Sequence, residues 1–316
     1  MVAPTKPIRT VHTVISEVSD ACGIRLLTLK DPDNWELPPA RAGSHIDIHL
    51  PNGLIRTYSL CGDCRVREEY KIGVKEAVEG RGGSACVHHE LKVGDVVRVS
   101  LPRCTFPAID PGVRTLFIAG GVGVTPFLSM ARELDRVGGD YELHLYYRDG
   151  IPLQAELAGI GRSGKVVLHD RALTTGASVG EALGRPNPGT RAYCCGPFPM
   201  IEEFQQATSD WDPAHVGVEY FVPPAQAPLE NAFTVVLKKS GLSVEASAGA
   251  SALHAIQNAG VALESACEGG VCGACKVRWL EGEPIHRDLC LTESERAQYF
   301  MPCVGGCNSP KLVIDL

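Results

Sequence analysis

The sequence predicts a multidomain protein that combines α+β and α/β regions. Three observations support this fold class. The first hundred residues contain short strand-like runs, strand and helix patterns alternate from about residue 113, and three cysteines lie within nine residues near the carboxyl end. A chain of 316 residues is long enough for two or three domains, since one domain usually takes about 100–200 residues.

Composition narrows the classes of protein that the chain can belong to. The net charge of −7 and the lack of a basic run argue against a nucleic-acid partner. No stretch approaches the roughly 18 apolar residues that a membrane helix requires. The first residues lack the apolar core of a signal peptide, so the thirteen cysteines favour metal ligation over disulfides. We therefore expect a cytoplasmic protein with no membrane partner.

Residues 1–110 are expected to form a small antiparallel barrel. The runs "VHTVISEVSD", "IRLLTLK", "SHIDIHLP", "YKIGVKEAV" and "DVVRVSLP" are rich in branched residues, and many of them alternate between apolar and polar positions. Gly, Pro and Asp separate them, as is typical of strands joined by turns. Several short strands with such spacing favour a barrel.

Residues 111–221 are expected to form a parallel α/β domain. "RTLFIAGG" is a continuous apolar run, as in a strand buried on both faces. A helix should follow, because Phe127, Met130, Ala131 and Leu134 recur at helical spacing. The runs "YELHLYYR", "KVVLHD" and "RAYCCGP" then read as strands, the last one before a second helix. This alternation predicts a parallel sheet.

The remaining residues divide into a linker and a third domain. Residues 222–231, "VPPAQAPLEN", lack apolar periodicity, and their prolines predict a fairly stiff linker. In residues 232–316, a hairpin, a short helix at "SALHAIQNAG" and a final strand at "KLVIDL" surround the cysteine-rich loop.

Two glycine turns in the α/β segment are candidates for binding a nucleotide. The first, "AGGVGVTPF", follows a buried strand, with Thr125 as the expected N-cap and Pro126 at the first helical position. The second, "CCGPFP", ends a later strand. Backbone N–H groups in such turns can approach phosphates at the carboxyl edge of a parallel sheet. Because a tight turn also requires glycine without a ligand, the first turn alone is weak evidence.

The cysteine loop "CEGGVCGACKV" has the spacing of an iron–sulfur site. Cys267, Cys272 and Cys275 follow C-x4-C-x2-C, the spacing of plant-type [2Fe–2S] loops, in which small residues let the backbone wrap the cluster. Zinc is the weaker alternative, because its sites usually pair two separate cysteine knuckles. The fourth ligand could be Cys290, which precedes an expected capping box of Thr292 and Glu295, or Cys303 or Cys307. Local chemistry leaves Cys303 and Cys307 nearly equal.

The stretch "RTYSL" in the barrel segment, with "GRGGS" one strand later, could bind a ligand that has a phosphate and a planar ring. An arginine, an aromatic ring and a hydroxyl on one strand can hold a phosphate, contact a planar ring and bond to its edge. An ordinary half-buried strand is the simpler reading of "RTYS" taken alone.

Taken in order, "RTYSL", "GVKEAVEGRGGS", "AGGVGVTP", "YYRD" and "CCGP" resemble the ferredoxin–NAD(P) reductase superfamily. With the cysteine loop at the end, essentially the whole chain resembles the phthalate dioxygenase reductase family. The resemblance implies a flavin-binding β-barrel, an NAD-binding α/β domain and a β-grasp plant-type ferredoxin domain. It also implies FMN, with FAD less expected, together with NADH and a [2Fe–2S] cluster.

The resemblance assigns residues to each cofactor. The expected flavin contacts at the phosphate and ring are Arg56, Thr57, Tyr58, Ser59, Val74, Lys75, Gly82, Gly83, Ser84 and Phe221. The expected nicotinamide nucleotide contacts are Gly120, Gly121, Gly123, Thr125, Cys195, Gly196 and Pro197. The expected cluster ligands are Cys267, Cys272, Cys275 and, from the family's spacing, Cys303. Apart from a contact of Cys195 with the nicotinamide, Cys194 and Cys195 are expected to be buried as small apolar residues.

The function implied is transfer of electrons from NADH through FMN and the cluster to a Rieske-type oxygenase or demethylase. Such a reaction requires no acid–base catalyst, because the cofactors carry the chemistry. A reductase for a cytochrome P450 or another acceptor is the alternative within enzymes, and a flavin and iron–sulfur redox sensor is the alternative outside them. NADH is expected over NADPH because Asp149, beside Arg148, would repel a 2′-phosphate.

Overall fold

The computed structural model describes residues 9–77, 80–106, 108–173, 176–185, 189–223 and 227–316. Residues 224–226 of the expected linker and the first eight residues of the expected barrel segment lie outside this part. The chain divides into two compact units, one of residues 10–221 and the other containing residues 222–316.

The first sheet of unit 10–221 is antiparallel, in the order β4-β3-β6-β1-β2-β5, with β7 pairing with β3. An isolated antiparallel bridge between Leu60 and Ile72 brings the end of β4 to β5 and closes the sheet into a barrel, as the sequence predicts. Apolar side chains fill its interior. The elements are β1 (Thr10–Ala21), β2 (Ile24–Lys30), β3 (Ser44–His49), β4 (Ile55–Ser59), β5 (Glu69–Lys75), α1 (Gly83–His89), β6 (Val96–Ser100) and β7 (Arg103–Cys104).

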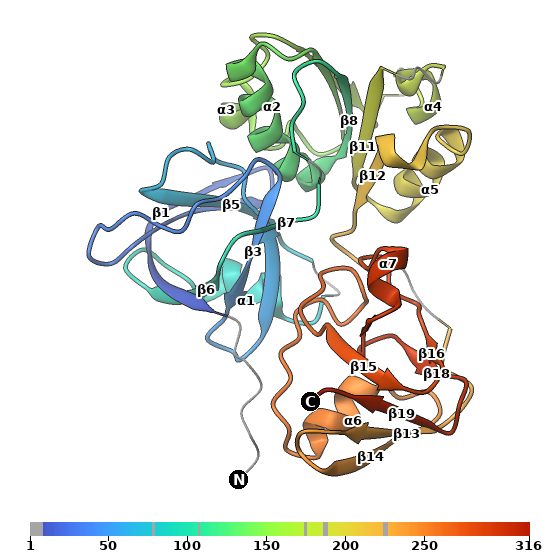
Figure 1. Ribbon diagram of the computed structural model, residues 1–316. Helices are drawn as coiled ribbons and strands as arrows, with labels where there is room; N and C mark the ends of the chain where they lie inside the picture. Colours follow the sequence, from blue (N-terminus) through green and yellow to red (C-terminus); the bar gives the residue numbers. More distant parts are fainter. Residues whose placement is uncertain (1–8, 78–79, 107, 174–175, 186–188, 224–226) are drawn as a thin grey trace. The chain divides into compact units, whose positions relative to one another are not determined.

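The second sheet of this unit is entirely parallel, in the order β10-β9-β8-β11-β12. Figure 1 shows α2 and α3 on one face of this sheet and α4 and α5 on the other. The strands are β8 (Arg114–Gly120), β9 (Tyr141–Tyr147), β10 (Lys165–Asp170), β11 (Thr190–Cys195) and β12 (Val216–Glu219). The helices are η1 (Gly121–Val124), α2 (Thr125–Val137), α3 (Gln154–Leu157), α4 (Val179–Leu183), α5 (Phe198–Ala207) and η2 (Pro213–His215).

Helix α2 confirms the predicted periodicity and corrects its predicted start. The four apolar residues that predicted the helix are all fully buried. Thr125 is the first helical residue rather than the N-cap, which is Val124. The physical reason is the 3₁₀ turn η1, which runs directly into α2, and the Thr125 hydroxyl donates to the carbonyl of Val122 inside that turn.

One apolar cluster contains residues of both the barrel and the parallel sheet. Phe106, at the end of the barrel segment, packs against Phe127 of α2 and Tyr193 of β11. Ile24 and Cys61 of the barrel belong to the same cluster. The barrel and the α/β sheet therefore form one compact unit.

The unit containing residues 222–316 has a five-stranded mixed sheet, in the order β14-β13-β19-β15-β17, and a small β16-β18 pair. The hairpin of β13 and β14 and the final strand β19 confirm the predicted elements, and β13 runs parallel to β19. Ser251 caps α6, and Thr292 and Glu295 form the predicted capping box of α7. The elements are β13 (Phe233–Leu237), β14 (Leu242–Ala246), α6 (Ala252–Asn258), β15 (Val277–Glu281), β16 (Pro284–Ile285), α7 (Glu293–Arg296), β17 (Tyr299–Phe300), β18 (Gly306–Cys307) and β19 (Lys311–Ile314).

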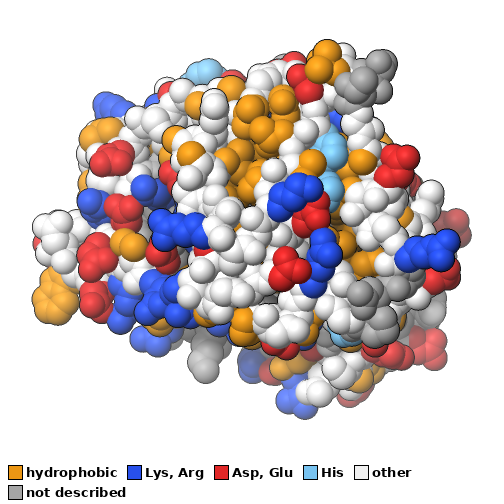
Figure 2. Space-filling view, turned by 90° about the horizontal axis from the view of Figure 1, so that it is seen from above, with side chains coloured by type: hydrophobic (Ala, Val, Ile, Leu, Met, Phe, Trp, Pro, Cys, Tyr) orange, Lys and Arg blue, Asp and Glu red, His pale blue; other side chains and the backbone are white. Residues whose placement is uncertain are grey.

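The surface carries charges of both signs. On the face shown in Figure 2, basic and acidic side chains are interspersed among apolar ones. Among the described residues, no helix combines the length and the apolar character needed to cross a lipid bilayer.

Candidate functional site

The predicted phosphate contacts of the flavin come together although 26 residues separate them in the sequence. A Cβ atom on Gly83 would lie 2.6 Å from Cγ and Nε of Arg56, so only glycine allows this arginine to lie on the turn. Arg56 donates to the carbonyls of Ile55 and Arg81 at 2.8 and 3.4 Å. Ser84 accepts a hydrogen bond from the backbone of Ala77. An arginine beside a Gly-Gly-Ser turn is a suitable environment for a phosphate.

The first four residues of "RTYSL" lie in β4, and the side chains of this strand alternate between two faces. Thr57 donates to Oδ1 of Asp47 at 2.7 Å, and Ser59 donates to Oε2 of Glu219 at 3.3 Å. Tyr58 packs beside the barrel core, and burial raises the pKa of its hydroxyl above the ordinary value. The strand therefore carries hydroxyls on one face and an aromatic ring on the other.

The other predicted flavin contacts lie on β5 and after β12. Val74 is buried in β5, whereas its neighbour Lys75 is exposed. Phe221 follows the end of β12 and exposes a large part of its ring. An exposed aromatic ring at the end of a strand is available to cover a planar ligand.

The two predicted nucleotide turns pack against each other through their backbones. A Cβ atom on Gly123 would lie 2.2 Å from the carbonyl oxygen of Cys195. A Cβ atom on Gly120 would lie 2.5 Å from the ring of Pro197. Close packing therefore explains two of the predicted glycines, whereas Gly121 borders open space. Both turns lie at the carboxyl ends of β8 and β11, next to each other in the sheet, where an α/β sheet binds nucleotides.

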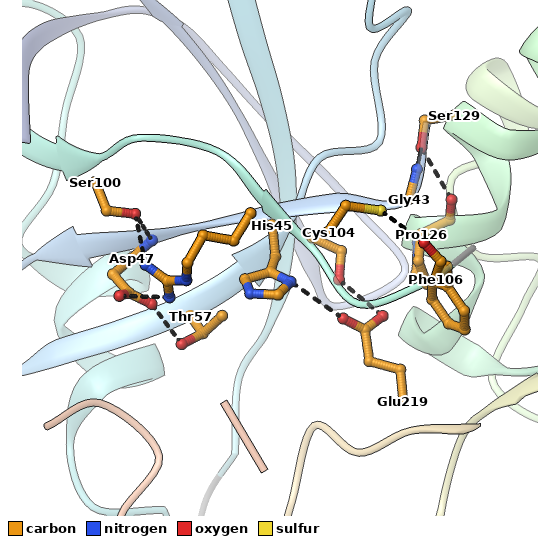
Figure 3. A network of polar contacts seen from close by, with 12 residues as sticks. Gly43, His45, Asp47, Thr57, Ser100, Cys104, Phe106, Pro126, Ser129 and Glu219 are labelled. Atoms are coloured by element: carbon orange, nitrogen blue, oxygen red, sulfur yellow. Dashed lines mark hydrogen bonds and ion pairs between the residues drawn. The ribbon is translucent and has the colours of Figure 1, made fainter. Parts of the chain in front are cut away.

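A buried polar network, which sequence reasoning missed, lies between these two regions. Glu219 ends β12 and pairs in register with Cys195. Figure 3 shows its carboxyl directed at His45 of β3, whose Nδ1 is 3.8 Å from Oε1. Burial raises the pKa of Glu219 to about 7, although the Ser59 hydrogen bond opposes this shift. The available signal was a carboxylate at the end of an apolar strand, directly before the Tyr–Phe pair.

A second buried carboxylate, that of Asp47, lies beside this network. Asp47 lies two residues after His45 on β3 and accepts from Arg103 at 2.7 Å and from Thr57. Its backbone N–H donates to the hydroxyl of Ser100. Asp47 and Arg103 neutralise each other, which is the usual requirement for burying either charge.

The cysteine loop holds its sulfurs in two pairs. The thiols of Cys267 and Cys272 are hydrogen-bonded, and so are those of Cys275 and Cys303. Across the described residues, no three His, Cys, Asp or Glu side chains are placed around a position for a single metal ion. Two thiol pairs instead fit a cluster of two iron atoms, each with two protein sulfurs.

Backbone N–H groups point at the first sulfur of the loop. Gly269 and Val271 donate to Sγ of Cys267 at 3.4 and 3.5 Å. The hydrogen bond from Cys272 contributes most, and these N–H groups add to it, so the pKa of Cys267 lies below its ordinary value. Such an environment favours a thiolate, the form that ligates iron.

The structure separates the three candidates for the fourth thiol. Cys303 belongs to the same apolar cluster as Cys275. Cys307 lies in the core of the mixed sheet, with its sulfur 3.2 Å from the hydroxyl of Ser309. Cys290 packs at the edge of the Cys275 cluster, where burial raises the pKa of its thiol to about 12. Cys303 is thus the one that shares a hydrogen bond with a thiol of the loop.

The remaining predicted residues have simple environments. Thr125 is buried at the start of α2. Cys194 and Cys195 are fully buried, and burial raises the pKa of both thiols. Arg148 and Asp149 are exposed directly after β9.

Comparisons with known proteins agree with this geometry. Residues 235–307 match the family described as the 2Fe-2S iron-sulfur cluster binding domain. The chain is 38% identical to the phenoxybenzoate dioxygenase subunit beta of Ectopseudomonas oleovorans over 310 residues, which cover 97% of this chain and 96% of that protein.

Two solved structures are similar over nearly the whole chain. One is described as phthalate dioxygenase reductase, a modular structure for electron transfer from pyridine nucleotides to [2Fe-2S]. It has a TM-score of 0.72 and 35% identity, covering 97% of this chain and 98% of that one. The other is an intact type IV self-sufficient cytochrome P450 monooxygenase, with a TM-score of 0.86 and 36% identity. This match covers 99% of the present chain and 43% of that longer one.

Proposed function

The chain belongs to the phthalate dioxygenase reductase family, and from that premise we propose that it transfers electrons from NADH, through FMN and a [2Fe–2S] cluster, to a Rieske-type oxygenase component. The observation that carries the proposal is the pairing of four cysteine thiols, three in a loop whose N–H groups donate to sulfur and the fourth, Cys303, brought to that loop by the fold. A protein with a flavin and a nucleotide site, but no such loop, would lack the one-electron outlet.

The proposed flavin site lies on the barrel. Arg56 and the Gly82–Ser84 turn would bind the phosphate, because the guanidinium side chain lies directly against Gly83 of that turn. Thr57, Ser59, Val74 and Lys75 would contact the ring system or its tail, with Tyr58 and Phe221 against the ring faces. When bound, FMN accepts a hydride from the nicotinamide and releases single electrons to the cluster.

The proposed nucleotide site lies where the two glycine turns meet. Gly120, Gly121, Gly123 and Thr125 would line it on one side, and Cys195, Gly196 and Pro197 on the other. NADH is the expected cofactor, since Asp149 offers a negative charge where NADPH would place its 2′-phosphate.

The proposed cluster ligands are Cys267, Cys272, Cys275 and Cys303. Their two hydrogen-bonded pairs support the assignment, and Cys307 has other partners. In domain terms, residues 1–110 would bind flavin, 111–221 NADH and 232–316 the cluster, with 222–231 as linker. The thirteen cysteines all lie within the described residues and form no disulfide, which suits a reducing cytoplasm, where we place the protein.

Partner choice is the part of the proposal that calls for an experiment. The holoprotein is reduced with NADH and mixed with a purified Rieske oxygenase component or with a cytochrome P450, and electron delivery is measured by stopped-flow absorbance. We expect the Rieske component to be reduced faster. The similarity to the P450 monooxygenase chain favours a P450 acceptor as the second candidate. Faster reduction of the P450 would establish that alternative.

A further inference from the structure

A buried histidine beside Glu219 has no part in the functions assigned so far. The side chain of His45 is 4% exposed, and within the described part of the chain neither ring nitrogen has a hydrogen-bond partner. Its Nδ1 lies 3.8 Å from Oε1 of Glu219, while Oε2 of the same carboxyl accepts from Ser59. The carboxyl of Glu219 therefore stands between an imidazole and a hydroxyl.

Strand pairing fixes this arrangement. His45 of β3 lies opposite Ser59 of β4 and opposite Arg103 of β7. Glu219 of β12 lies opposite Cys195 of β11. Because each of these residues is held by a ladder of backbone hydrogen bonds, the imidazole and the carboxyl face each other without depending on a mobile loop.

The charged and titratable groups around the pair come from three strands besides that of Glu219. They are Asp47 on the strand of His45, Arg103 on β7 and Cys195 on β11, while β4 supplies the hydroxyl of Ser59. Burial, and then the charge of Arg103, lowers the pKa of His45 to about 4, with Asp47 partly opposing. The pKa of Glu219 is raised to about 7 by burial. Near neutral pH, the imidazole is thus uncharged, whereas the carboxyl exists in both forms.

A neutral imidazole can serve either form of the carboxyl, because one ring nitrogen is a donor and the other an acceptor. The Nδ1–H tautomer donates to ionised Glu219. The Nε2–H tautomer leaves Nδ1 free to accept from the O–H of protonated Glu219. If an apolar side chain stood in the place of His45, Ser59 would be the remaining side-chain partner of the Glu219 carboxyl.

We propose that His45 is a positioning residue of the electron-transfer reaction, which holds the Glu219 carboxyl against Ser59 in both protonation states. The present separation is longer than a hydrogen bond, and a proton shared between Oε1 and Nδ1 would draw the two groups together. The inference rests on the proposed function. Glu219 lies beside both Ser59, a proposed flavin contact, and Cys195, a proposed nicotinamide contact.

Two substitutions of His45 distinguish the effect of its hydrogen bonds from the effect of its volume. His45→Asn keeps a donor and an acceptor near the position of Nδ1, whereas His45→Leu fills a similar volume with neither. The first measurement is the pKa of Glu219 in the apoprotein. The titration is monitored by the infrared carbonyl band of the protonated carboxyl, which is identified by its disappearance in Glu219→Gln. His45→Leu loses the bond to either form of the carboxyl, and the bond to the ionised form is the stronger of the two because it is charge-assisted. The pKa of Glu219 should therefore rise by about one unit in His45→Leu, a tenfold change in the equilibrium, and stay near the wild type in His45→Asn.

The second measurement is the pH profile of NADH-dependent flavin reduction in a single turnover of the holoprotein. We expect its midpoint to move upward with the Glu219 pKa in His45→Leu, at unchanged flavin content, and to be restored in His45→Asn. If the leucine variant fails to fold, His45→Ala replaces it, because it removes both nitrogens without adding bulk.

The outcomes are distinct. An unchanged Glu219 pKa in the leucine or alanine variant, or an equal shift in the asparagine variant, would overturn the role of His45. A wild type that binds no flavin or does not oxidise NADH would overturn the proposed function instead. The infrared comparison, made on the apoprotein, decides the relation of His45 to Glu219 in either case.

Discussion

Cys267 of the cysteine loop and Glu219 of the buried network have opposite environments for their ionisable groups. Around Cys267, the Cys272 thiol and backbone N–H groups donate to the sulfur, and the pKa of the thiol falls. Around Glu219, one hydroxyl donates, the imidazole is uncharged, and burial raises the pKa of the carboxyl. Cys267 is thus favoured as a thiolate, whereas hydrogen bonds to neighbouring thiols and burial raise the pKa of Cys272 and of Cys275. At neutral pH the carboxyl of Glu219 exists in both its protonated and its ionised form.

The largest expected effect tests the thiol side of this comparison. Cys303→Ser should lose or strongly shift the visible charge-transfer bands of the cluster, because thiolate ligation produces them. Cys290→Ser and Cys307→Ser are the matched controls and should keep the bands. Absorption spectra and iron analysis of the three variants decide the point. Intact bands and full iron content in the Cys303 variant would show that another residue is the fourth ligand.

The next effect separates the two regions physically. A chain that ends after Pro223 retains the unit with the Glu219 network and lacks the cysteine loop. NADH-dependent reduction of ferricyanide should survive, because this acceptor does not require the cluster, whereas cytochrome c reduction and oxygenase turnover should collapse. All three activities are assayed on soluble, flavin-loaded protein. Full oxygenase turnover by the shortened chain would refute the proposed electron path.

A third prediction concerns the carboxyl side alone. Because the folded pKa of Glu219 is about 7, above its ordinary value of 4.5, the wild type should lose stability as pH rises from about 4.5 to 7 and no further above that. Glu219→Gln removes this loss. The free energy of unfolding of the variant, relative to that of the wild type, should therefore increase over the same pH range by at most about 3 kcal/mol. Urea unfolding at pH 5 and pH 8 measures the difference.

Glu17→Gln, an exposed substitution in the same unit, is the control for this pH dependence. It should remain near the wild type at both pH values. A Glu219→Gln variant whose stability relative to the wild type falls with pH would show that the folded carboxyl prefers its ionised form, and the contrast with the cysteine loop would then disappear.

The smallest expected effect concerns charges outside both regions. We expect kcat/KM for NADH to exceed that for NADPH, because Asp149 repels the 2′-phosphate across exposed, well-screened surface. Asp149→Asn should narrow the preference by about 1.4-fold to fivefold, the range of a single exposed charge. Steady-state kinetics with both nucleotides test this. A wild type that prefers NADPH would contradict it.

The features predicted correctly from the sequence are those encoded locally. The C-x4-C-x2-C spacing places its thiols on one loop, and the apolar period of α2 is a property of consecutive turns. Thr125 was misplaced by one position because the 3₁₀ turn before it depends on the packing of the two nucleotide turns. Local chemistry could not separate Cys303 from Cys307, since the difference arises only when the chain returns to Cys275.

The Glu219 network could not be predicted, for a related reason. Its members come from three separate stretches of the sequence, around residues 45, 59 and 219, and the local pattern of each stretch does not reveal that it meets the other two. Strand register alone brings His45 opposite Ser59, and the separate register of β12 with β11 places Glu219 beside Cys195. The charge state of each group then depends on burial, which sequence spacing does not reveal.

The core shared by the barrel and the parallel sheet has a consequence for modular engineering. Phe106 packs against Phe127 and Tyr193, and Gly43 donates to the hydroxyl of Ser129, so a cut between the two sheets would expose apolar surface on both sides. The two sheets should therefore melt in one cooperative transition and be inherited or exchanged together. The unit after residue 221 has a core of its own, so it is the part of the chain that could be replaced by a different electron-accepting domain.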